Sequence, residues 1–389
     1  MDVVMLWRYY PAYLSYFYRK NPKAHDLSYN KHQNLIFADY FGWPASLCKY
    51  MNRIGIKTKF IIANAETLQK QWAVENGFSD YNEKNWEKTI VLAQLREFQP
   101  DFLWLTSIFD YYGHFIQSAL QYTDKIVSWI GSPFVQELDV RGVSVLLTEN
   151  PMTLRKYHDD FENVVVTKPG FDEEILTHLG TSDARKGLSF LGQISPLHKQ
   201  RAGILAFLIE NGIPIDIHGA IKGARHHSER KISAAYLRSL WQSIIGRLSR
   251  SKGEFGNFVD EYEQSISVLS GVVKKPLFGL DYYRRLIRSE MTLNVHIDMA
   301  ENHAGNMRLF EATGVGTAVI TENSENIASL FLPGEEVFVF NSKNHLLEII
   351  RTNMRDKAKI NYVATAGQKR ILRHYTLSAM FESIKHVFE

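Results

Sequence analysis

The sequence predicts an α/β protein made of two doubly wound domains that face a cleft. Short apolar runs rich in β-branched and aromatic residues alternate with longer segments of helical period, which is the pattern of βαβ units and parallel sheets. The alternation breaks at residues 168–172 and starts again at Leu188. One sheet is therefore expected before this break and a second sheet after it.

The expected elements have ordinary boundaries. A helix over residues 44–54 ends at Gly55 and another over residues 86–98 ends before Pro100, and both are common helix stops. In the second domain, helices are expected over residues 199–211, 281–289 and 305–313. The expected strands cover residues 3–6, 59–62, 102–106, 126–130, 144–148, 164–167, 188–191, 215–218, 292–296 and 317–321.

These elements divide the 389 residues into two domains of ordinary size. The first domain covers residues 1–170, and a linker of residues 171–187 follows it. The second domain covers residues 188–370 and carries an insertion at residues 222–275. Residues 371–389 are expected to form a helix that packs back on the first domain.

Composition excludes several classes of protein. Hydrophobic residues make up 45% of the chain and charged residues 22%, so wholesale disorder is excluded. The net charge of +3 provides no global field for nucleic acid, and no nucleic-acid partner is expected. The single cysteine, Cys48, excludes an internal disulfide and fits a reducing cytosol. A buried, inert thiol is favoured over a nucleophile.

The N-terminal region predicts a cytoplasmic protein. No signal peptide opens the chain, because Arg8, Arg19 and Lys20 interrupt the first apolar region. The longest weakly charged stretch, residues 102–123, contains charged and polar groups that would be costly in a bilayer. We therefore expect no transmembrane helix.

A basic segment lies inside the insertion. Residues 222–252 hold eight Lys and Arg against one acid. Two interpretations stay open: a basic amphipathic helix that contacts the anionic inner face of a membrane or a lipid-linked substrate, and a core-facing helix with a solvated basic side. The apolar stripe that supports both consists of Leu237, Leu240, Trp241, Ile244, Ile245 and Leu248.

Two strand ends have the form of an anion site. In a doubly wound sheet, ligands bind beyond the carboxyl ends of the strands, where the N-terminus of the next helix attracts anions. After one predicted strand, Gly192 lets a ligand approach the backbone and Arg201 lies one turn into the next helix. After another predicted strand, Gly305 and Asn306 suit a helix start.

Arg308 and Glu311 follow on one face of the helix that begins near Asn306. Arg308 supplies a planar cation for a phosphate, and the carboxylate of Glu311 can accept two hydrogen bonds from the hydroxyls of a ribose. This arrangement indicates a nucleotide site. The alternative is a solvated ion pair between the two side chains.

From about Leu188 to Phe340 the sequence resembles the C-terminal domain of glycosyltransferases with the GT-B fold of two Rossmann-like domains. The resemblance is to the group 1 and spore-coat-glycosyltransferase-like branch. The first half of the chain resembles the acceptor domain of these enzymes in strand order only. The stretches that carry the resemblance are residues 188–201, residues 282–296 (YYRRLIRSEMTLNVH) and residues 305–340 (GNMRLFEATGVGTAVITENSENIASLFLPGEEVFVF).

The resemblance implies roles for individual residues. It implies that Glu311 binds the ribose of the donor and that Asn306 and Arg308 lie at the diphosphate. It also implies that Gly192 lines the donor cleft, with Arg201 as the basic residue after it. One departure concerns the donor sugar: where many relatives have a glutamate, eight positions before the ribose-binding glutamate, this chain has His303.

Glycosyl transfer requires stabilisation of the departing diphosphate, which fixed cations can provide without a metal. Arg201, Arg308 and either Lys274 or Lys275 are the candidates. We also expect no metal because no Asp-x-Asp sequence occurs, and because the adjacent His226 and His227 would not point the same way on a helix or strand.

An inverting enzyme also needs a base in the first domain, whereas a retaining enzyme does not. Asp110 and His114 are the candidates, because they follow a predicted strand. Asp39 and His25 are weaker candidates. The alternative interpretations are that Asp110 caps the next helix and that His303 is a capping or core histidine.

Aromatic residues make up 13% of the chain and gather after the first predicted strand. Tyr9, Tyr10 and Tyr13 are therefore candidates to stack on the sugars of the acceptor. The alternative is that these rings pack in the core.

The sequence thus predicts a glycosyltransferase that moves a sugar from a nucleotide-sugar donor to a glycan or lipid-linked acceptor in surface polysaccharide biosynthesis, with no cofactor and no metal. One alternative is a sugar epimerase or phosphorylase of the same fold. The other is a non-catalytic module that binds a nucleotide or a glycan.

Overall fold

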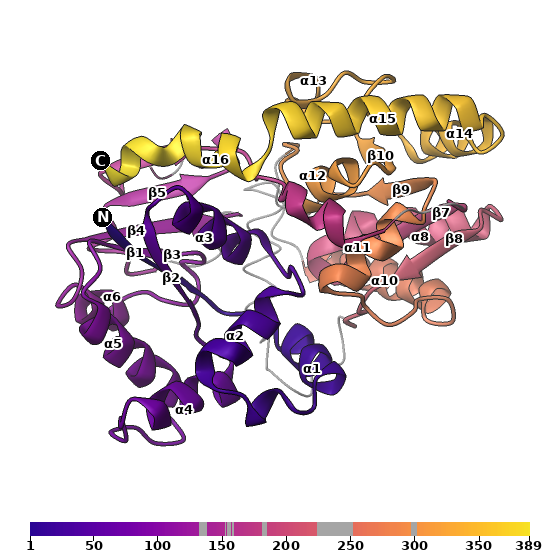
Figure 1. The fold of residues 1–389 in the computed structure, drawn as a ribbon. Coiled ribbons are helices and arrows are strands. Elements are labelled where there is room, and N and C mark those ends of the chain that lie inside the picture. Colours follow the sequence, from indigo (N-terminus) through magenta and orange to yellow (C-terminus); the bar gives the residue numbers. More distant parts are fainter. Residues whose placement is uncertain are drawn as a thin grey trace.

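The computed structural model describes residues 1–131, 138–151, 153, 157, 159–180, 185–223, 252–296 and 302–389. It contains two parallel β-sheets with helices packed on them (Figure 1). The strand order is β2-β1-β3-β4-β5-β6 in the first sheet and β11-β10-β9-β7-β8 in the second. Both are doubly wound orders, so the predicted fold class is confirmed.

The strands of the first sheet are β1 (Asp2–Trp7), β2 (Lys57–Ile62), β3 (Phe102–Leu105), β4 (Lys125–Ile130), β5 (Val145–Thr148) and β6 (Asn163–Val166). The strands of the second sheet are β7 (Leu188–Leu191), β8 (Ile215–His218), β9 (Met291–Asn294), β10 (Ala318–Glu322) and β11 (Phe338–Phe340). Every predicted strand is present with its ends within two residues of the prediction. The short strand β11 was not predicted, because three residues show no period.

The helices associated with the first sheet are α1 (Pro11–Lys20), α2 (Tyr29–Phe37), α3 (Trp43–Arg53), α4 (Glu66–Glu75), α5 (Trp86–Phe98) and α6 (His114–Ala119). Those that follow are α8 (Lys199–Glu210), α10 (Lys252–Leu269), α11 (Gly279–Ile287), α12 (Met307–Gly314), α13 (Ile327–Leu330), α14 (Lys343–Asn353), α15 (Lys357–His374) and α16 (Leu377–Ile384). Short 3₁₀ helices cover Ala24–Asp26, Glu173–His178, Pro196–His198 and Lys385–Phe388.

The last helix returns to the first domain. In Figure 1, α16, in yellow, lies beside α3 after α15 has run along the second domain. Its buried residues Leu377, Met380, Phe381 and Ile384 belong to the same apolar core as Met5 of β1. The first domain is therefore built from both ends of the chain.

The chain crosses between the domains at two adjoining places. Phe171 forms a parallel bridge with Thr376, the amide of Phe171 donates to the carbonyl of Tyr375 at 2.7 Å, and the amide of Leu377 donates to the carbonyl of Phe171 at 3.1 Å. The two crossing segments are therefore held side by side.

Side chains also join the domains directly. Lys20 of α1 lies 2.9 Å from the carboxylate of Asp281 on α11, which also accepts a hydrogen bond from Tyr16. The backbone amide of Leu280 donates to Asp39 at 3.4 Å. These contacts place α1 and the start of α11 against each other.

Two predictions lie at or beyond the limits of the described residues. The apolar stripe around Trp241 is outside them, and so is the pair His226 and His227. Among the described helices, none is both long enough and apolar enough to cross a bilayer. Cys48 is buried, and burial raises the pKa of its thiol to about 12, so the thiol is protonated at neutral pH and inert.

Removing the ring of Phe381 should destabilise the first domain. This side chain is 4% exposed within the core that α16 completes, so Phe381→Ala should lower the free energy of unfolding by about 3–5 kcal/mol. Urea unfolding followed by tryptophan fluorescence measures the change. The control is Tyr362→Ala on α15. Tyr362 is 54% exposed, so this change should alter the free energy of unfolding by less than about 0.5 kcal/mol. Equal effects of the two variants would contradict this role for α16.

Candidate active site

Both sheets have a topological switch point, where neighbouring strands lead to connections on opposite faces and ligands commonly bind. In the first sheet it lies between β1 and β3, and in the second between β7 and β9. Arg8 and Tyr10 follow β1, and Asp110 follows β3. Gly192 follows β7, and the loop after β9 leads to α12. Several of the predicted site residues therefore lie at these two points, and others do not.

Arg308 spans the switch point of the second domain. Its guanidinium carbon lies 5.0 Å from the centre of the Phe190 ring on β7, a cation–π contact. A Cβ atom at position 192 would overlap the guanidinium, so Gly192 makes room for Arg308 as well as for a ligand. The Nη1 atom of Arg308 is buried and has no hydrogen-bond partner among the described residues. A buried, unsatisfied cationic donor at this place suits an anionic ligand.

Glu311 lies one turn after Arg308 on α12. Its two carboxylate oxygens accept hydrogen bonds from Tyr282 at 2.9 Å and from Tyr283 at 3.1 Å. Burial raises the pKa of Glu311, whereas the two hydroxyls and Arg308 lower it. The alternative of a simple solvated ion pair is wrong, because the carboxylate is oriented by two tyrosines of α11. Each carboxylate oxygen keeps a lone pair for a further donor.

His198 lies in a region of positive electrostatic potential near Arg308. Its Nδ1 atom lies 2.7 Å from the hydroxyl of Ser195. Burial, together with the charges of Arg201, Arg308 and Lys222, lowers the pKa of His198 to about 2. These cations lie around the start of α8, whose free amides add to the positive potential. The positive potential at the carboxyl end of β7 therefore favours the binding of an anion.

Arg201 lies beneath this loop. It is 4% exposed and donates to the carbonyl of Gln193 at 2.5 Å and to the carbonyl of Val295 at 2.8 Å. It therefore ties the end of β7 to the end of β9. Because Arg201 is buried, its positive charge acts on a ligand through the electrostatic potential and not through a contact at the surface.

Asn306 occupies the N-cap position of α12, where the helix-start signal predicted a helix to begin, but its side chain makes no capping hydrogen bond. Its side-chain amide donates to Asn294 at 2.7 Å, and Asn294 donates back at 3.2 Å. His303 lies 3.9 Å from Glu325 and lines a groove of about 810 Å³ together with His296. His303 is therefore at the wall of a groove beside the start of α12.

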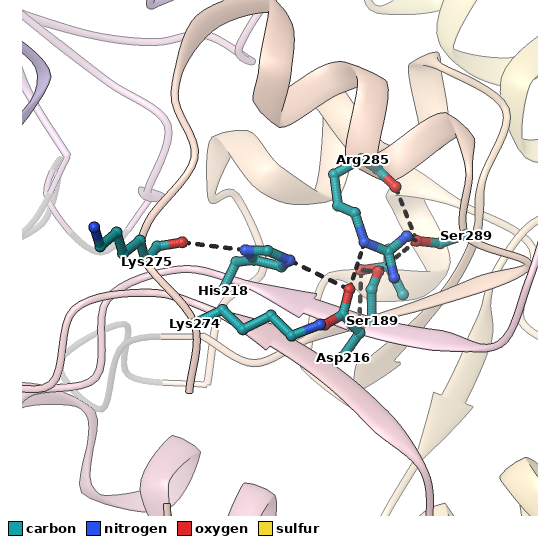
Figure 2. Close-up of polar contacts among 8 residues, drawn as sticks. Ser189, Asp216, His218, Lys274, Lys275, Arg285 and Ser289 are labelled. Atoms are coloured by element: carbon teal, nitrogen blue, oxygen red, sulfur yellow. Dashed lines mark hydrogen bonds and ion pairs between the residues drawn. The ribbon is translucent and has the colours of Figure 1, made fainter. Parts of the chain in front are cut away.

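Lys274 belongs to a separate ionic cluster at the edge of the sheet (Figure 2). Asp216 of β8 lies 2.6 Å from Lys274 and 2.6 Å from Arg285, and His218 is 3.2 Å away. Although burial raises the pKa of Asp216, hydrogen bonds from Lys274 and Arg285 hold it at about 2. The charge of Lys274 is therefore already balanced by Asp216.

In the first domain, Asp110 lies 3.3 Å from Arg8, which also contacts Glu87 at 2.9 Å. Asp110 does not cap the next helix, because α6 begins at His114 after Gly113. His114 is exposed, and its Nδ1 atom lies 3.2 Å from the hydroxyl of Ser118. Asp110 is thus held at the switch point by a cation, whereas His114 is a surface residue.

The three tyrosines proposed for the acceptor lie in different environments. Tyr9 is 2% exposed and Tyr13 is 0% exposed, and both rings pack on Phe41 in the core. Tyr10 is 61% exposed. Desolvation raises the pKa of the Tyr10 hydroxyl, the negative charges of Glu311 and Asp110 raise it further, and Arg308 lowers it. The hydroxyl of Tyr10 is therefore within the electrostatic influence of charged groups from both domains.

The weaker candidates have structural surroundings. Asp39 accepts its bond from Leu280 at the domain interface, and burial raises the pKa of Asp39 to about 6. His25 is exposed and lies 3.3 Å from Asp26. Among the described residues, no group of three or more His, Cys, Asp or Glu side chains is arranged to hold a metal ion.

Sequence reasoning assigned no role to Tyr282, Tyr283, His198 or Glu149. Tyr282 and Tyr283 directly precede Arg284 and Arg285 in the sequence, and this order alone is a weak signal of a binding site. His198 stands before a predicted helix. Glu149 follows a predicted strand in the same way as Asp110, so the rule that selected Asp110 applies to it equally.

The carboxylate of Asp216 should stabilise the protein in a pH-dependent manner. Its pKa is depressed from 3.8 to about 2, so the stabilisation of about 2 kcal/mol is present above pH 4 and is lost as the pH falls through 2. The stability difference between wild type and Asp216→Asn, from urea unfolding, should therefore shrink between these values. The exposed Asp80→Asn is the control, and a pH-independent difference for Asp216→Asn would refute the role of its charge.

Comparisons with known proteins agree with the fold. Residues 201–385 match the glycosyl transferase-like family, while no curated protein sequence matches the chain. Sucrose-phosphate synthase from Thermosynechococcus elongatus is similar in structure, with a TM-score of 0.55 and 11% identity, over 100% of this chain and 98% of that chain. A glycosyltransferase from Rickettsia africae has a TM-score of 0.54 and 9% identity, over 100% and 97% of the two chains.

A third similar structure is that of Anabaena HepE in complex with UDP-glucose. Its TM-score is 0.54 and its identity 13%, over 100% of this chain and 99% of that chain. At these identities the structures show the fold, and the family match covers the domain that holds Arg308 and Glu311. The chain thus has the two-domain GT-B fold of these structures, and residues 201–385, in its second domain, match the glycosyl transferase-like family.

Proposed function

We propose that this enzyme transfers a hexose from a nucleoside diphosphate sugar on its second domain to a glycan or lipid-linked acceptor on its first domain. The reaction needs no metal and serves surface polysaccharide biosynthesis. The observation that carries the donor assignment is the carboxylate of Glu311, oriented by Tyr282 and Tyr283 one turn after Arg308.

The donor fits the second domain from ribose to diphosphate. The remaining lone pairs of Glu311 accept the two ribose hydroxyls, which a neutral residue at this place would bind less strongly. The diphosphate lies at the start of α12, near Nη1 of Arg308 and the backbone of Gly192. Because Anabaena HepE has been crystallised with UDP-glucose, uridine is the first nucleotide to test.

The departing diphosphate gains negative charge as the sugar leaves. The positive potential that keeps His198 neutral acts at this position, with Arg201, Arg308 and Lys222 as its sources. Fixed charges of this kind need no reorganisation during the reaction. They support a mechanism in which protein cations serve where other transferases use a metal.

We assign the acceptor to the first domain, and the support is that Tyr10 is within the electrostatic influence of Asp110 and of the donor residues Arg308 and Glu311. Its exposed ring offers an apolar face to a sugar. A lipid-linked acceptor and contact with the cytoplasmic face of a membrane rest on the basic residues 222–252, most of which lie outside the described residues.

Incubation with UDP-glucose, alone and with a panel of glycan and polyprenyl-phosphate acceptors, tests the proposal. Release of UDP that depends on an acceptor supports transfer. Isomerisation of the donor alone would indicate an epimerase, and sugar release that needs inorganic phosphate would indicate a phosphorylase. Nucleotide binding without turnover would indicate a binding module.

Removing the carboxylate of Glu311 should weaken nucleotide binding. Hydrogen bonds to a charged group contribute about 1.5–3 kcal/mol, so Glu311→Ala should lower the affinity for UDP about 10- to 100-fold in isothermal titration calorimetry. Glu348→Ala, on the exposed face of α14, is the control and should bind UDP as the wild type does. An unchanged affinity for Glu311→Ala would overturn the ribose assignment.

Adding a methyl group at Gly192 should disturb the diphosphate position. The new Cβ would overlap the guanidinium of Arg308, which must move, so Gly192→Ala should weaken UDP binding more than uridine binding. Calorimetry with the two ligands separates these effects. Gly271→Ala meets no neighbouring atom within 4 Å and is the matched control. Equal losses for UDP and uridine would place the disturbance away from the diphosphate.

A further inference from the structure

The residue before α11 packs into the first domain. The ring of Phe278 contacts the rings of Tyr13, Tyr16 and Phe41, with centroid separations of 5.9, 5.6 and 5.9 Å. Tyr13 and Phe41 are themselves stacked at 3.7 Å, so the first domain offers a rigid aromatic surface at this place. A side chain of the second domain is therefore seated on an aromatic cluster of the first.

The backbone at the start of α11 also touches the first domain. Gly279 has a φ of 53°, and a Cβ atom at this position would overlap both the carboxylate and the carbonyl of Asp39. The amide of the next residue, Leu280, donates to the same carboxylate at 3.4 Å. The left-handed backbone and the close approach of Asp39 both require a glycine here. The first turn of α11 is thus held by the first domain.

Asp281 adds side-chain contacts with α1. Its Oδ2 atom accepts hydrogen bonds from the hydroxyl of Tyr16 and from Lys20, the latter at 2.9 Å, and its Oδ1 atom accepts one from Arg284 at 3.1 Å. Although burial raises the pKa of Asp281, the hydrogen bonds from Tyr16 and Lys20 hold it below its usual value, so the carboxylate is charged at neutral pH. Hydrogen bonds to an ionised group are the strong ones.

The same helical turn reaches the candidate donor site. Tyr282 and Tyr283 directly follow Asp281, and their hydroxyls bind the two carboxylate oxygens of Glu311 at 2.9 and 3.1 Å. Consecutive residues of α11 are therefore bound to α1 of the first domain and to the carboxylate that we assign to the ribose. A shift of the first turn of α11 would move both tyrosine hydroxyls relative to that carboxylate.

We infer that Asp281 is a positioning residue through which the first domain strengthens donor binding, an inference that rests on the proposed function. With Asp281 held by α1, the two tyrosines that follow it keep the Glu311 carboxylate in its orientation. A nucleoside diphosphate then binds better when this contact is made than when it is broken. By linkage, the bound nucleotide strengthens the contact between the domains by the same free energy.

Two substitutions test the link in calorimetry with UDP. Tyr16→Phe keeps the ring and removes one hydrogen bond to Asp281, and it should weaken UDP binding about 2- to 30-fold. Asp281→Ala should weaken binding at least as much, and in that variant Tyr16→Phe should have no further effect, because Tyr16 acts through Asp281. Tyr18→Phe removes the same atom from a tyrosine of α1 that contacts His32, and it should bind UDP as the wild type does.

Two further measurements distinguish positioning from a purely structural role. In turnover of UDP-glucose, Tyr16→Phe should raise KM and leave kcat unchanged, because the lost interaction supports donor and transition state alike. Hydrogen exchange reports the helix start directly, since the amide of Leu280 donates to Asp39 and that of Tyr282 to the carbonyl of Phe278. UDP should slow exchange of both amides in the wild type, and less so in Tyr16→Phe.

The outcomes separate this inference from the proposed function. If Glu311→Ala weakens UDP binding while Tyr16→Phe and Asp281→Ala bind UDP as the wild type does, the contact only joins the domains and the inference is overturned. Additive losses in the double variant, or a fall in kcat with KM unchanged, would also overturn it. A wild type that binds no UDP, or a Glu311→Ala variant with full affinity, would instead overturn the proposed donor site.

Discussion

The candidate site depends on the contact of Arg308 with Phe190 and Gly192. This contact joins the start of α12 to the end of β7 across the switch point of the second sheet. It fixes the guanidinium where we propose that the diphosphate binds, and it fixes Glu311 one turn further along the same helix. The two tyrosines of α11 then orient the Glu311 carboxylate. A glycine at the end of β7 is thus a packing requirement of the arginine, in addition to its place beside the ligand.

The arrangement of the domains follows from the same topology. Each sheet has its switch point at the carboxyl ends of its central strands, and Tyr10, which follows β1, is within the electrostatic influence of Arg308 and Glu311 on α12. The chain passes between the domains at Phe171 and Thr376, which are bridged to each other. Residues of α16 belong to the core of the first domain, so the C-terminal half of the chain contributes to the cores of both domains.

The sequence predicted the strands well because buried parallel strands are continuous apolar runs with punctuated ends. It also located Arg308 and Glu311, since helix spacing places them on one face. The sequence did not predict the partners of side chains that pair with groups far away along the chain. Lys274 is balanced by Asp216, 58 positions earlier, and Arg201 is used by backbone carbonyls at two strand ends. Aromatic density after β1 predicted a sugar-binding surface, yet Tyr9 and Tyr13 fill the core, because local composition does not show which rings point inward.

The division of charge between the domains has a chemical reason. A carboxylate close to cations is a weak base, as Asp216 shows with a pKa of about 2 beside Lys274 and Arg285. Stabilising a diphosphate requires such cations, whereas accepting a proton near neutral pH requires their absence. One compact cluster cannot meet both conditions. The cations of the second domain lie around α12 and β7, whereas Glu149 lies at the edge of the first sheet, where burial raises the pKa of its carboxyl to about 7.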